Sequence, residues 1–224
     1  MKIALINASP RGKISTSNKL LKEIKGLLPD NYEFAEIHAN KDKLSEQQCE
    51  SLIDSDIWIF ANPLYIDSLP GHLLAILEAL QSLCERNQNK NHKVYALINC
   101  GFYEADQNKP AVRVYQNWCK RTGLDWCGAV GIGGGGAITF MPEEMPFNAG
   151  PLKPIFKALV KISECIKTGS AMENTYVSFG FPRFLYIKLA HYGWRKAIKE
   201  NGKKPKDLYL RPACPDYKDG DAIN

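Results

Sequence analysis

Short apolar runs alternate with longer segments of helical periodicity through most of the chain. The short runs end at turn-forming residues, and the longer segments carry apolar side chains three and four positions apart. This alternation is typical of an α/β protein with a parallel sheet, because parallel strands need crossover connections that helices usually provide. We expect strands at residues 2–7, 32–38, 57–61, 94–100 and 126–132, and helices around residues 20–28, 44–53, 70–85, 111–121 and 152–166.

The last quarter of the chain does not continue the alternation. One amphipathic helix is expected at residues 183–201, and an irregular tail follows it. The apolar face of this helix would comprise Phe184, Ile187, Trp194 and Ile198. We therefore expect a core domain at residues 1–168 and a helical C-terminal extension at residues 169–224. The extension is too apolar to remain in solvent, so we expect it to pack on the core or on a partner subunit.

Length and composition fit one core with an extension better than two independent domains. The 224 residues are 45% hydrophobic and 24% charged, which is ordinary for a globular protein. No run of about 18 apolar residues occurs, and the apolar run at the N-terminus is too short for a signal peptide. We expect a cytoplasmic protein without a membrane partner.

Seven cysteines lie far apart and form no C-x-x-C pair. This spacing argues against a disulfide framework, a zinc site and an iron–sulfur cluster, because each of these needs closer or paired cysteines. Reduced and mostly buried thiols are expected instead, with no bound metal.

Positive charge is concentrated near the C-terminus. The formal net charge is +5, and nine Lys or Arg residues but only two acids lie between Arg183 and Arg211. Such a segment is either a solvated face or a contact for a polyanion or a cofactor phosphate. No recognisable pattern of base-stacking aromatics accompanies it, so no nucleic-acid partner is expected.

The sheet itself predicts where a ligand would bind. In an open parallel sheet, ligands lie beyond the carboxyl ends of the strands at the point where the strand order reverses. For the order 2-1-3-4-5 this point lies between the first and third strands. The loops that follow Asn7, Ala61 and Cys100 are therefore the candidates, and all three have unusual compositions.

The first of these loops, ASPRGKISTSNKLL, leads directly into a helix. The free amide groups and positive end of that helix favour an anion, and Arg11 is able to add a charge-assisted contact. Neither G-x-x-x-x-G-K-S/T nor G-x-G-x-x-G is present, so neither an ATP loop nor a dinucleotide loop is indicated. A serine-capped helix without a ligand is the structural alternative. Hydroxyl donors here are Ser9, Ser15, Thr16 and Ser17.

The other two loops offer surfaces for a flat aromatic ligand. In NPLYIDSLPGHLL, Pro63 fixes the backbone so that the next three residues can form a wall, although a tyrosine at such a position is often ordinary packing. In NCGFYEADQN, Gly101 permits close approach of the backbone, while Phe102 and Tyr103 can flank a ring. Four glycines at 133–136 are either a hinge over that ring or a loose connection.

Together the three loops resemble the NADPH-dependent FMN reductase group of flavodoxin-like flavoproteins. The resemblance rests on SPR followed by STSN, on PLYIDSLPGHLLAILE and on NCGFYE, and it covers roughly residues 1–137. It implies a flavodoxin-like three-layer α/β sandwich with a five-stranded parallel sheet in the order 2-1-3-4-5. Two features depart from the family pattern: Ala8 stands where a glycine is common, and the chain after Gly169 matches no family motif.

The resemblance also implies which residues would hold FMN. The phosphate would lie among Ser9, Arg11, Thr16, Ser17 and Asn18, with Ser15 added for its hydroxyl. The ribityl chain and the ring would contact Pro63, Leu64, Tyr65 and Ile66. The pyrimidine edge would lie near Asn99, Cys100, Gly101 and Phe102. By the same resemblance, NADPH or NADH would donate a hydride to FMN, and a quinone, a free flavin or a similar small acceptor would receive the electrons. No catalytic side chain is required, and a homodimer is expected.

Two other classes of protein remain open. A flavodoxin-type electron carrier would bind FMN without turning over a nicotinamide, but the acidic surface usual for such carriers is missing from this basic chain. A flavin-free interaction module on the same scaffold is the second alternative, because a fold does not fix a function.

Overall fold

The computed structural model describes residues 1–86, 91–139, 141 and 145–210. The chain divides into two units, Met1–Gly180 and Phe181–Asn224, which are treated separately here. Cys214 and the part of the predicted extension that follows residue 210 lie outside the described residues.

The first unit is built on a six-stranded sheet in the order β2-β1-β3-β4-β5-β6, in which every neighbouring pair is parallel. The predicted order of the first five strands is confirmed, and the sequence-based count of five is corrected to six. The strands are β1 (Lys2–Asn7), β2 (Glu33–His38), β3 (Ile57–Pro63), β4 (Lys93–Asn99), β5 (Asp125–Ile132) and β6 (Thr175–Val177).

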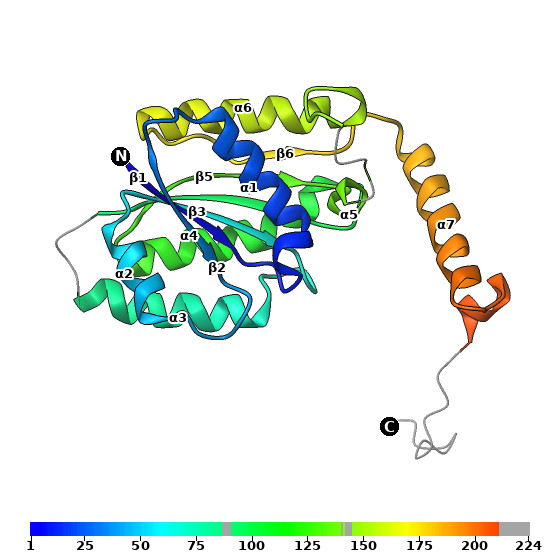
Figure 1. Cartoon of the computed structure of the whole chain (residues 1–224), viewed down its shortest axis with the longest axis horizontal. Helices are drawn as coiled ribbons and strands as arrows, with labels where there is room; N and C mark the ends of the chain where they lie inside the picture. The colour runs from blue at the N-terminus through cyan, green and yellow to red at the C-terminus, as the bar shows by residue number, and fades with distance from the viewer. Residues whose placement is uncertain (87–90, 140, 142–144, 211–224) are drawn as a thin grey trace, which may run out of the picture. The chain divides into compact units, whose positions relative to one another are not determined.

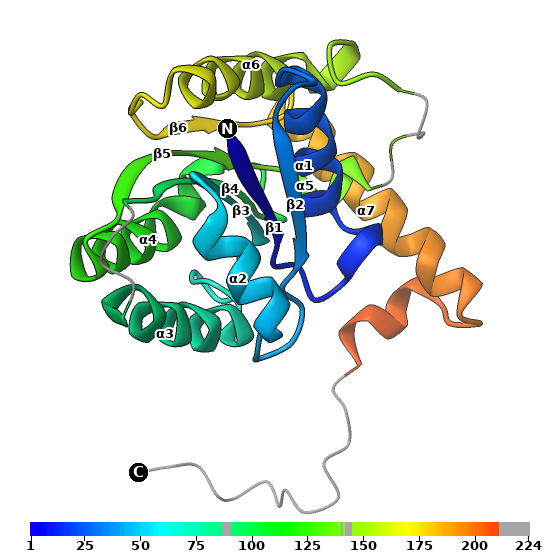
Figure 2. The same cartoon turned by 60° about the vertical axis from the view of Figure 1, so that its left-hand side comes forward.

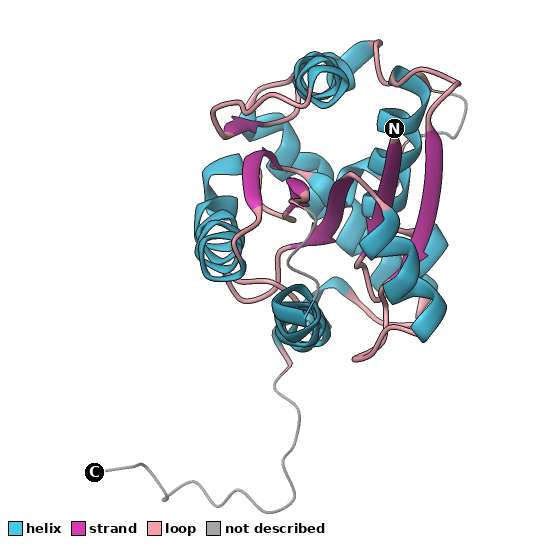
Figure 3. Cartoon of the chain, turned by 90° about the vertical axis from the view of Figure 1, so that its left-hand side faces the viewer, coloured by secondary structure: helices cyan, strands magenta, loops and turns pink. Residues whose placement is uncertain are grey.

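Helices cover both faces of this sheet, which gives the expected three layers. Helices α1 and α6 lie on one face, and α3 and α4 lie on the other with α2 (Figure 1). Turning the molecule separates the two helical layers more clearly (Figure 2), and the strands form the middle layer (Figure 3). The helices are α1 (Thr16–Leu27), α2 (Glu46–Asp54), α3 (Gly71–Arg86), α4 (Lys109–Thr122), the short α5 (Gly135–Ile138) and α6 (Lys153–Thr168).

The central strands β3 and β4 are mostly apolar because both of their faces are covered. Every residue of β3 except Pro63 is buried, and so is every residue of β4 except Lys93. Aromatic side chains fill the space between β3 and α4, where the rings of Phe60 and Tyr115 lie 5.3 Å apart. Gly123 ends α4 in the left-handed conformation, as its position in the sequence predicts.

The sixth strand belongs to the first unit, although it lies beyond residue 168, where the sequence analysis placed the end of the core domain. Strand β6 pairs with the end of β5 through Val130–Thr175, Gly131–Tyr176 and Ile132–Val177. Phe179, just after the strand, is buried. This stretch therefore completes the sheet domain, and the boundary moves to Gly180. A strand of three half-exposed residues at a sheet edge is too short to give a periodic hydrophobic signal in the sequence.

The second unit, as far as it is described, contains helix α7 (Arg183–Glu200) and a short 3₁₀ helix, η4 (Pro205–Tyr209). Helix α7 lies where the sequence predicts a helix. None of its residues is buried. Packing of this unit on the core or on a partner subunit stays a prediction. None of the described helices is both long and apolar enough to cross a bilayer.

Candidate functional site

Three loops meet at the carboxyl ends of β1, β3 and β4, and one buried side chain connects them. The Asn99 side-chain amide donates one hydrogen bond to Ser17 Oγ at 3.2 Å and another to the Asn62 carbonyl at 3.1 Å. Asn62 is itself fixed, because the hydroxyl of the buried Tyr115 donates to its Oδ1 at 2.8 Å. The loops after β1, β3 and β4 are thus held in one structure, as the strand order predicts.

The loop after β1 is folded back on itself by Asn7. Its side chain accepts a hydrogen bond from the Ser9 amide at 3.1 Å and donates one to the Gly12 carbonyl at 3.0 Å. Gly12 has a φ of +56°, which glycine adopts more readily than other residues. A short 3₁₀ helix, η1 (Gly12–Ile14), follows, and Ser15 Oγ caps α1 by accepting from the Asn18 amide at 3.1 Å.

Most side-chain hydroxyls in this loop already have protein partners. Ser15 Oγ donates to the Gly12 carbonyl at 2.6 Å, and Thr16 Oγ1 donates to the Gly135 carbonyl at 2.7 Å. The Asn18 side chain donates to the Lys13 carbonyl at 2.9 Å. These three predicted site residues therefore shape the loop through their side chains rather than presenting them to a ligand.

Other groups of the same loop remain suited to an anion. The Ser9 and Ser17 oxygens each accept a hydrogen bond, from the Arg11 amide and from Asn99 respectively, which leaves their protons for another acceptor. The amides of Thr16 and Ser17 start α1, where helix geometry provides no intrahelical acceptor. Arg11, which precedes Thr16 by five residues in the same loop, has an exposed side chain. The positive end of α1 adds a favourable field for negative charge.

The loop after β3 contains backbone strain. Tyr65 and Ser68 exchange two backbone hydrogen bonds, of 3.0 and 3.1 Å, around a two-residue turn. The turn residues Ile66 and Asp67 have φ angles of 49° and 55°, a region that β-branched residues rarely occupy. Ile66 is nevertheless 99% exposed, so no burial of its side chain compensates for the strain.

Predicted residues around this turn fall into two groups. Tyr65 and Ile66 are exposed and available to a ligand, and Pro63 is partly exposed at the end of β3. Leu64 instead packs into the core, and its amide donates to the Asn99 carbonyl at 2.7 Å. Leu64 therefore supports the loop from below.

The loop after β4 shows the same division. Cys100 is buried in the core, and burial raises the pKa of its thiol. Gly101 is exposed, and a Cβ added to it would meet no atom within 4 Å. Phe102 is 57% exposed. The backbone of this loop is therefore open to a ligand, while its thiol is not.

The glycine run 133–136 packs tightly against that loop, which the sequence did not predict. The Gly135 amide donates to the Cys100 carbonyl at 2.7 Å. A Cβ at Gly133 would lie 2.1 Å from the Tyr103 carbonyl oxygen, and one at Gly135 would lie 2.7 Å from Asn99 Oδ1. The run is thus neither a hinge nor a loose connection but a place of close backbone approach. A glycine run alone does not distinguish these possibilities.

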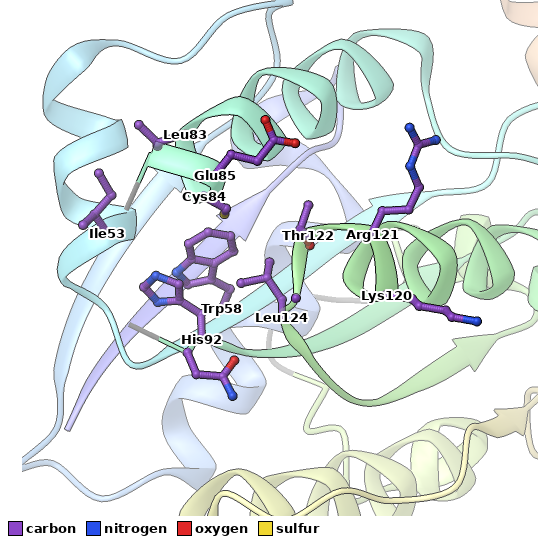
Figure 4. Close-up of a pocket in the computed structure, with 12 residues that line it drawn as sticks. Ile53, Trp58, Leu83, Cys84, Glu85, His92, Lys120, Arg121, Thr122 and Leu124 are labelled. Carbon is purple, nitrogen blue, oxygen red and sulfur yellow. The ribbon is translucent and has the colours of Figure 1, made fainter. Parts of the chain in front are cut away.

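A separate cavity of about 440 Å³ lies at the opposite end of the strands. Trp58 and His92, near the starts of β3 and β4, stack there with their ring centres 4.5 Å apart (Figure 4). Lys120 and Arg121, at the end of α4, line its rim. It is therefore remote from the three loops. Among the described residues, no cluster of three or more His, Cys, Asp or Glu side chains is placed to bind a metal ion.

Fold and strand order together define a flavodoxin-like α/β protein. Residues 1–111, just under half of the chain, match the model of the NADPH-dependent FMN reductase family. The sequence has no match among curated proteins.

Solved structures show the same fold at low sequence identity. An NADH:FMN oxidoreductase in its apo form matches with a TM-score of 0.56 and 16% identity, covering 81% of this chain and 96% of its own. An FMN-dependent NADH-azoreductase from Bacillus anthracis matches with a TM-score of 0.52 and 13% identity, covering 75% and 100%. An NADPH-quinone reductase from P. pentosaceus matches with a TM-score of 0.51 and 12% identity, covering 76% and 100%.

Replacing Gly133 by Ala should destabilise the protein, because the new Cβ would collide with the Tyr103 carbonyl and force the loop after β4 to move. The expected loss in the free energy of unfolding is about 1–3 kcal/mol. Gly136→Ala is the matched control, since a Cβ at Gly136 meets no atom within 4 Å. Urea unfolding measures both variants. Equal unfolding midpoints for the two would contradict the close approach at Gly133.

Replacing Ile66 by Gly should leave the free energy of unfolding unchanged or raise it by up to about 1 kcal/mol. Relief of the left-handed strain, worth about 1–2 kcal/mol, opposes the larger backbone entropy that glycine brings to the unfolded chain. The control is Ile14→Gly, at an exposed position without positive φ, which should lose stability. A clear loss from Ile66→Gly would show that the turn is unstrained.

Proposed function

We propose that this chain binds FMN across the loops after β1, β3 and β4 and uses NADPH or NADH to reduce a small electron acceptor such as a quinone or a flavin. The observation that carries the proposal is the pair of hydrogen bonds from Asn99, which holds an anion-binding loop and two loops with exposed apolar residues together at one end of the sheet. The match of residues 1–111 to the NADPH-dependent FMN reductase family supports the choice of ligand.

The phosphate of FMN suits the loop after β1. A phosphate needs several donors and positive charge, and this loop offers the Thr16 and Ser17 amides, the Ser9 hydroxyl and the exposed Arg11 guanidinium. The carboxylates nearest in sequence are Glu23 and Asp30, beyond the first turn of α1, so no like charge of the loop itself opposes the phosphate. The donor set therefore fits the group.

The flavin ring suits the other two loops. Tyr65, Ile66 and Phe102 present apolar side chains that are 45%, 99% and 57% exposed, and a flat ligand would remove part of this surface from water. The open side of Gly101 lets a ring edge approach the backbone, where amide groups are able to contact the pyrimidine atoms. The strain at Ile66 is consistent with a binding role, because strained backbone concentrates at functional sites.

Bound FMN would supply the redox chemistry, accepting a hydride from a nicotinamide and passing two electrons to the acceptor. The chain's own residues hold and orient the reactants: the first loop fixes the phosphate, and buried Leu64 and Cys100 support the backbone below the ring. The Cys100 thiol takes no part, because burial keeps it protonated. We propose no catalytic side chain. A homodimer also remains a proposal.

Purified protein should bind FMN, and NADPH or NADH should bleach the visible absorbance of the bound flavin under anaerobic conditions. Titration of FMN fluorescence measures binding, and anaerobic spectra measure reduction. Reoxidation by a quinone or by free flavin would then complete the cycle. Protein that binds no FMN contradicts the proposal. Protein that binds FMN but stays oxidised with both nicotinamides would be a flavodoxin-type electron carrier instead.

Replacing Arg11 by Glu should weaken FMN binding by about 10- to 100-fold, because a charge-assisted contact to the phosphate is lost and a like charge takes its place. The fold should be unaffected, since Arg11 is exposed. Lys157→Glu makes the same charge change at an exposed position of α6 and is the control. Equal FMN affinity in the two variants would place the phosphate away from Arg11.

A further inference from the structure

All of the excess positive charge belongs to the second unit. Residues 1–180 contain 19 Lys or Arg and 19 Asp or Glu residues, so the sheet domain is formally neutral. The segment from Arg183 to Arg211, by contrast, contains nine Lys or Arg residues and two acids. Helix α7 occupies most of this segment, and Glu200 is its single acid.

Helix α7 carries an apolar stripe beside a basic stripe. The apolar stripe consists of Ile187, Ala190, Trp194 and Ile198, which recur at intervals of three or four residues. The basic stripe consists of Lys188, Arg195 and Lys199, each one position further along the helix. Since consecutive residues are about 100° apart around a helix, the two stripes lie side by side rather than on opposite faces.

The basic stripe has no acidic partners in the part of the chain that the structure describes. There, no carboxylate lies within ion-pair distance of Lys188, Arg195 or Lys199, whereas Lys196 pairs with Glu200 at 3.8 Å. In the apolar stripe, Trp194 is 65% exposed, and Ile187, Ala190 and Ile198 are partly exposed. Cations without acidic partners and a partly exposed apolar stripe thus occur on the same helix.

We propose that α7 and the basic residues that follow it bind an anionic lipid surface, with the helix lying in the plane of the interface. A helix with an apolar stripe and flanking Lys and Arg residues is suited to this position, because the apolar groups reach the acyl boundary while the cations stay at the headgroups. Trp194 is placed to enter the interface, where indole rings are favoured.

The charge and the apolar surface of α7 favour an anionic lipid surface over a second copy of the chain or a nucleic acid. A second copy of the chain would bring an equally basic segment to the contact, and the neutral sheet domain offers no net charge to attract it. A nucleic acid would satisfy the cations but leave the apolar stripe in water. An anionic bilayer offers negative headgroups to the basic stripe and an apolar region to the apolar stripe. The lack of a bilayer-spanning helix among the described residues does not oppose this binding mode, because an interfacial helix does not cross the membrane.

Flotation of the full-length protein with vesicles tests the proposal, with or without FMN. Vesicles of phosphatidylcholine and phosphatidylglycerol in equal amounts should bind the protein, and vesicles of phosphatidylcholine alone should bind it far less. Salt should release it, because screening weakens exposed charge interactions. Trp194→Glu should abolish binding. The triple variant Lys188→Gln, Arg195→Gln, Lys199→Gln should bind about 100-fold less, since each cation near an anionic surface contributes roughly fivefold.

The matched control removes three exposed cations from helices of the first unit, Lys120→Gln, Lys157→Gln and Lys161→Gln, and should bind like the unchanged protein. Failure of the unchanged protein to bind the anionic vesicles would overturn the proposal. So would equal loss of binding in the control and in the α7 variant. A stable dimer that Trp194→Glu converts to monomer, without vesicle binding, would assign the helix to a second copy. A large loss of folding stability in Trp194→Glu would assign it to the core.

Discussion

The candidate site depends on the side-chain amide of Asn99. This group is buried at the end of β4, and it uses both of its N–H groups, one on the loop after β1 through Ser17 and one on the end of β3 through Asn62. A buried amide that lost these partners would cost about 1–3 kcal/mol, so the loops are held where the amide can reach both acceptors. The Tyr115 hydroxyl extends the network into the core by fixing Asn62. The geometry of a surface site is thus set by hydrogen bonds in the interior.

Close packing at the glycine run and strain at Ile66 are two results of the same arrangement. Gly133 and Gly135 let the chain after β5 approach the loop after β4 so closely that any side chain there would collide. The rigid frame below then holds Ile66 in a left-handed conformation that isolated chains avoid. An exposed β-branched residue in this conformation gains nothing from the fold itself. If a flat ligand covered the Ile66 side chain, the apolar surface removed from water would offset the strain of this conformation.

The sequence predicts the five principal strands and their helices because their apolar periodicity is long and regular. It also predicts which loops meet, since strand order alone brings the ends of β1, β3 and β4 together. Strand β6 is missed because three half-exposed residues carry no periodic signal. The roles of individual site residues are also missed: whether Thr16 faces a ligand or donates to Gly135 depends on contacts between segments more than a hundred residues apart. Such contacts leave no local pattern in the sequence.

The two proposed anion sites would use charge in physically different ways. The sheet domain is formally neutral, so an anion at the first loop would be held by a few donors at hydrogen-bond distance rather than by a general positive field. Two of those donors are backbone amides of α1, whose partial charges do not titrate. The segment around α7 offers several Lys and Arg side chains spread along a helix. It is therefore suited to an extended surface of many negative charges, whereas the first loop is suited to a single phosphate.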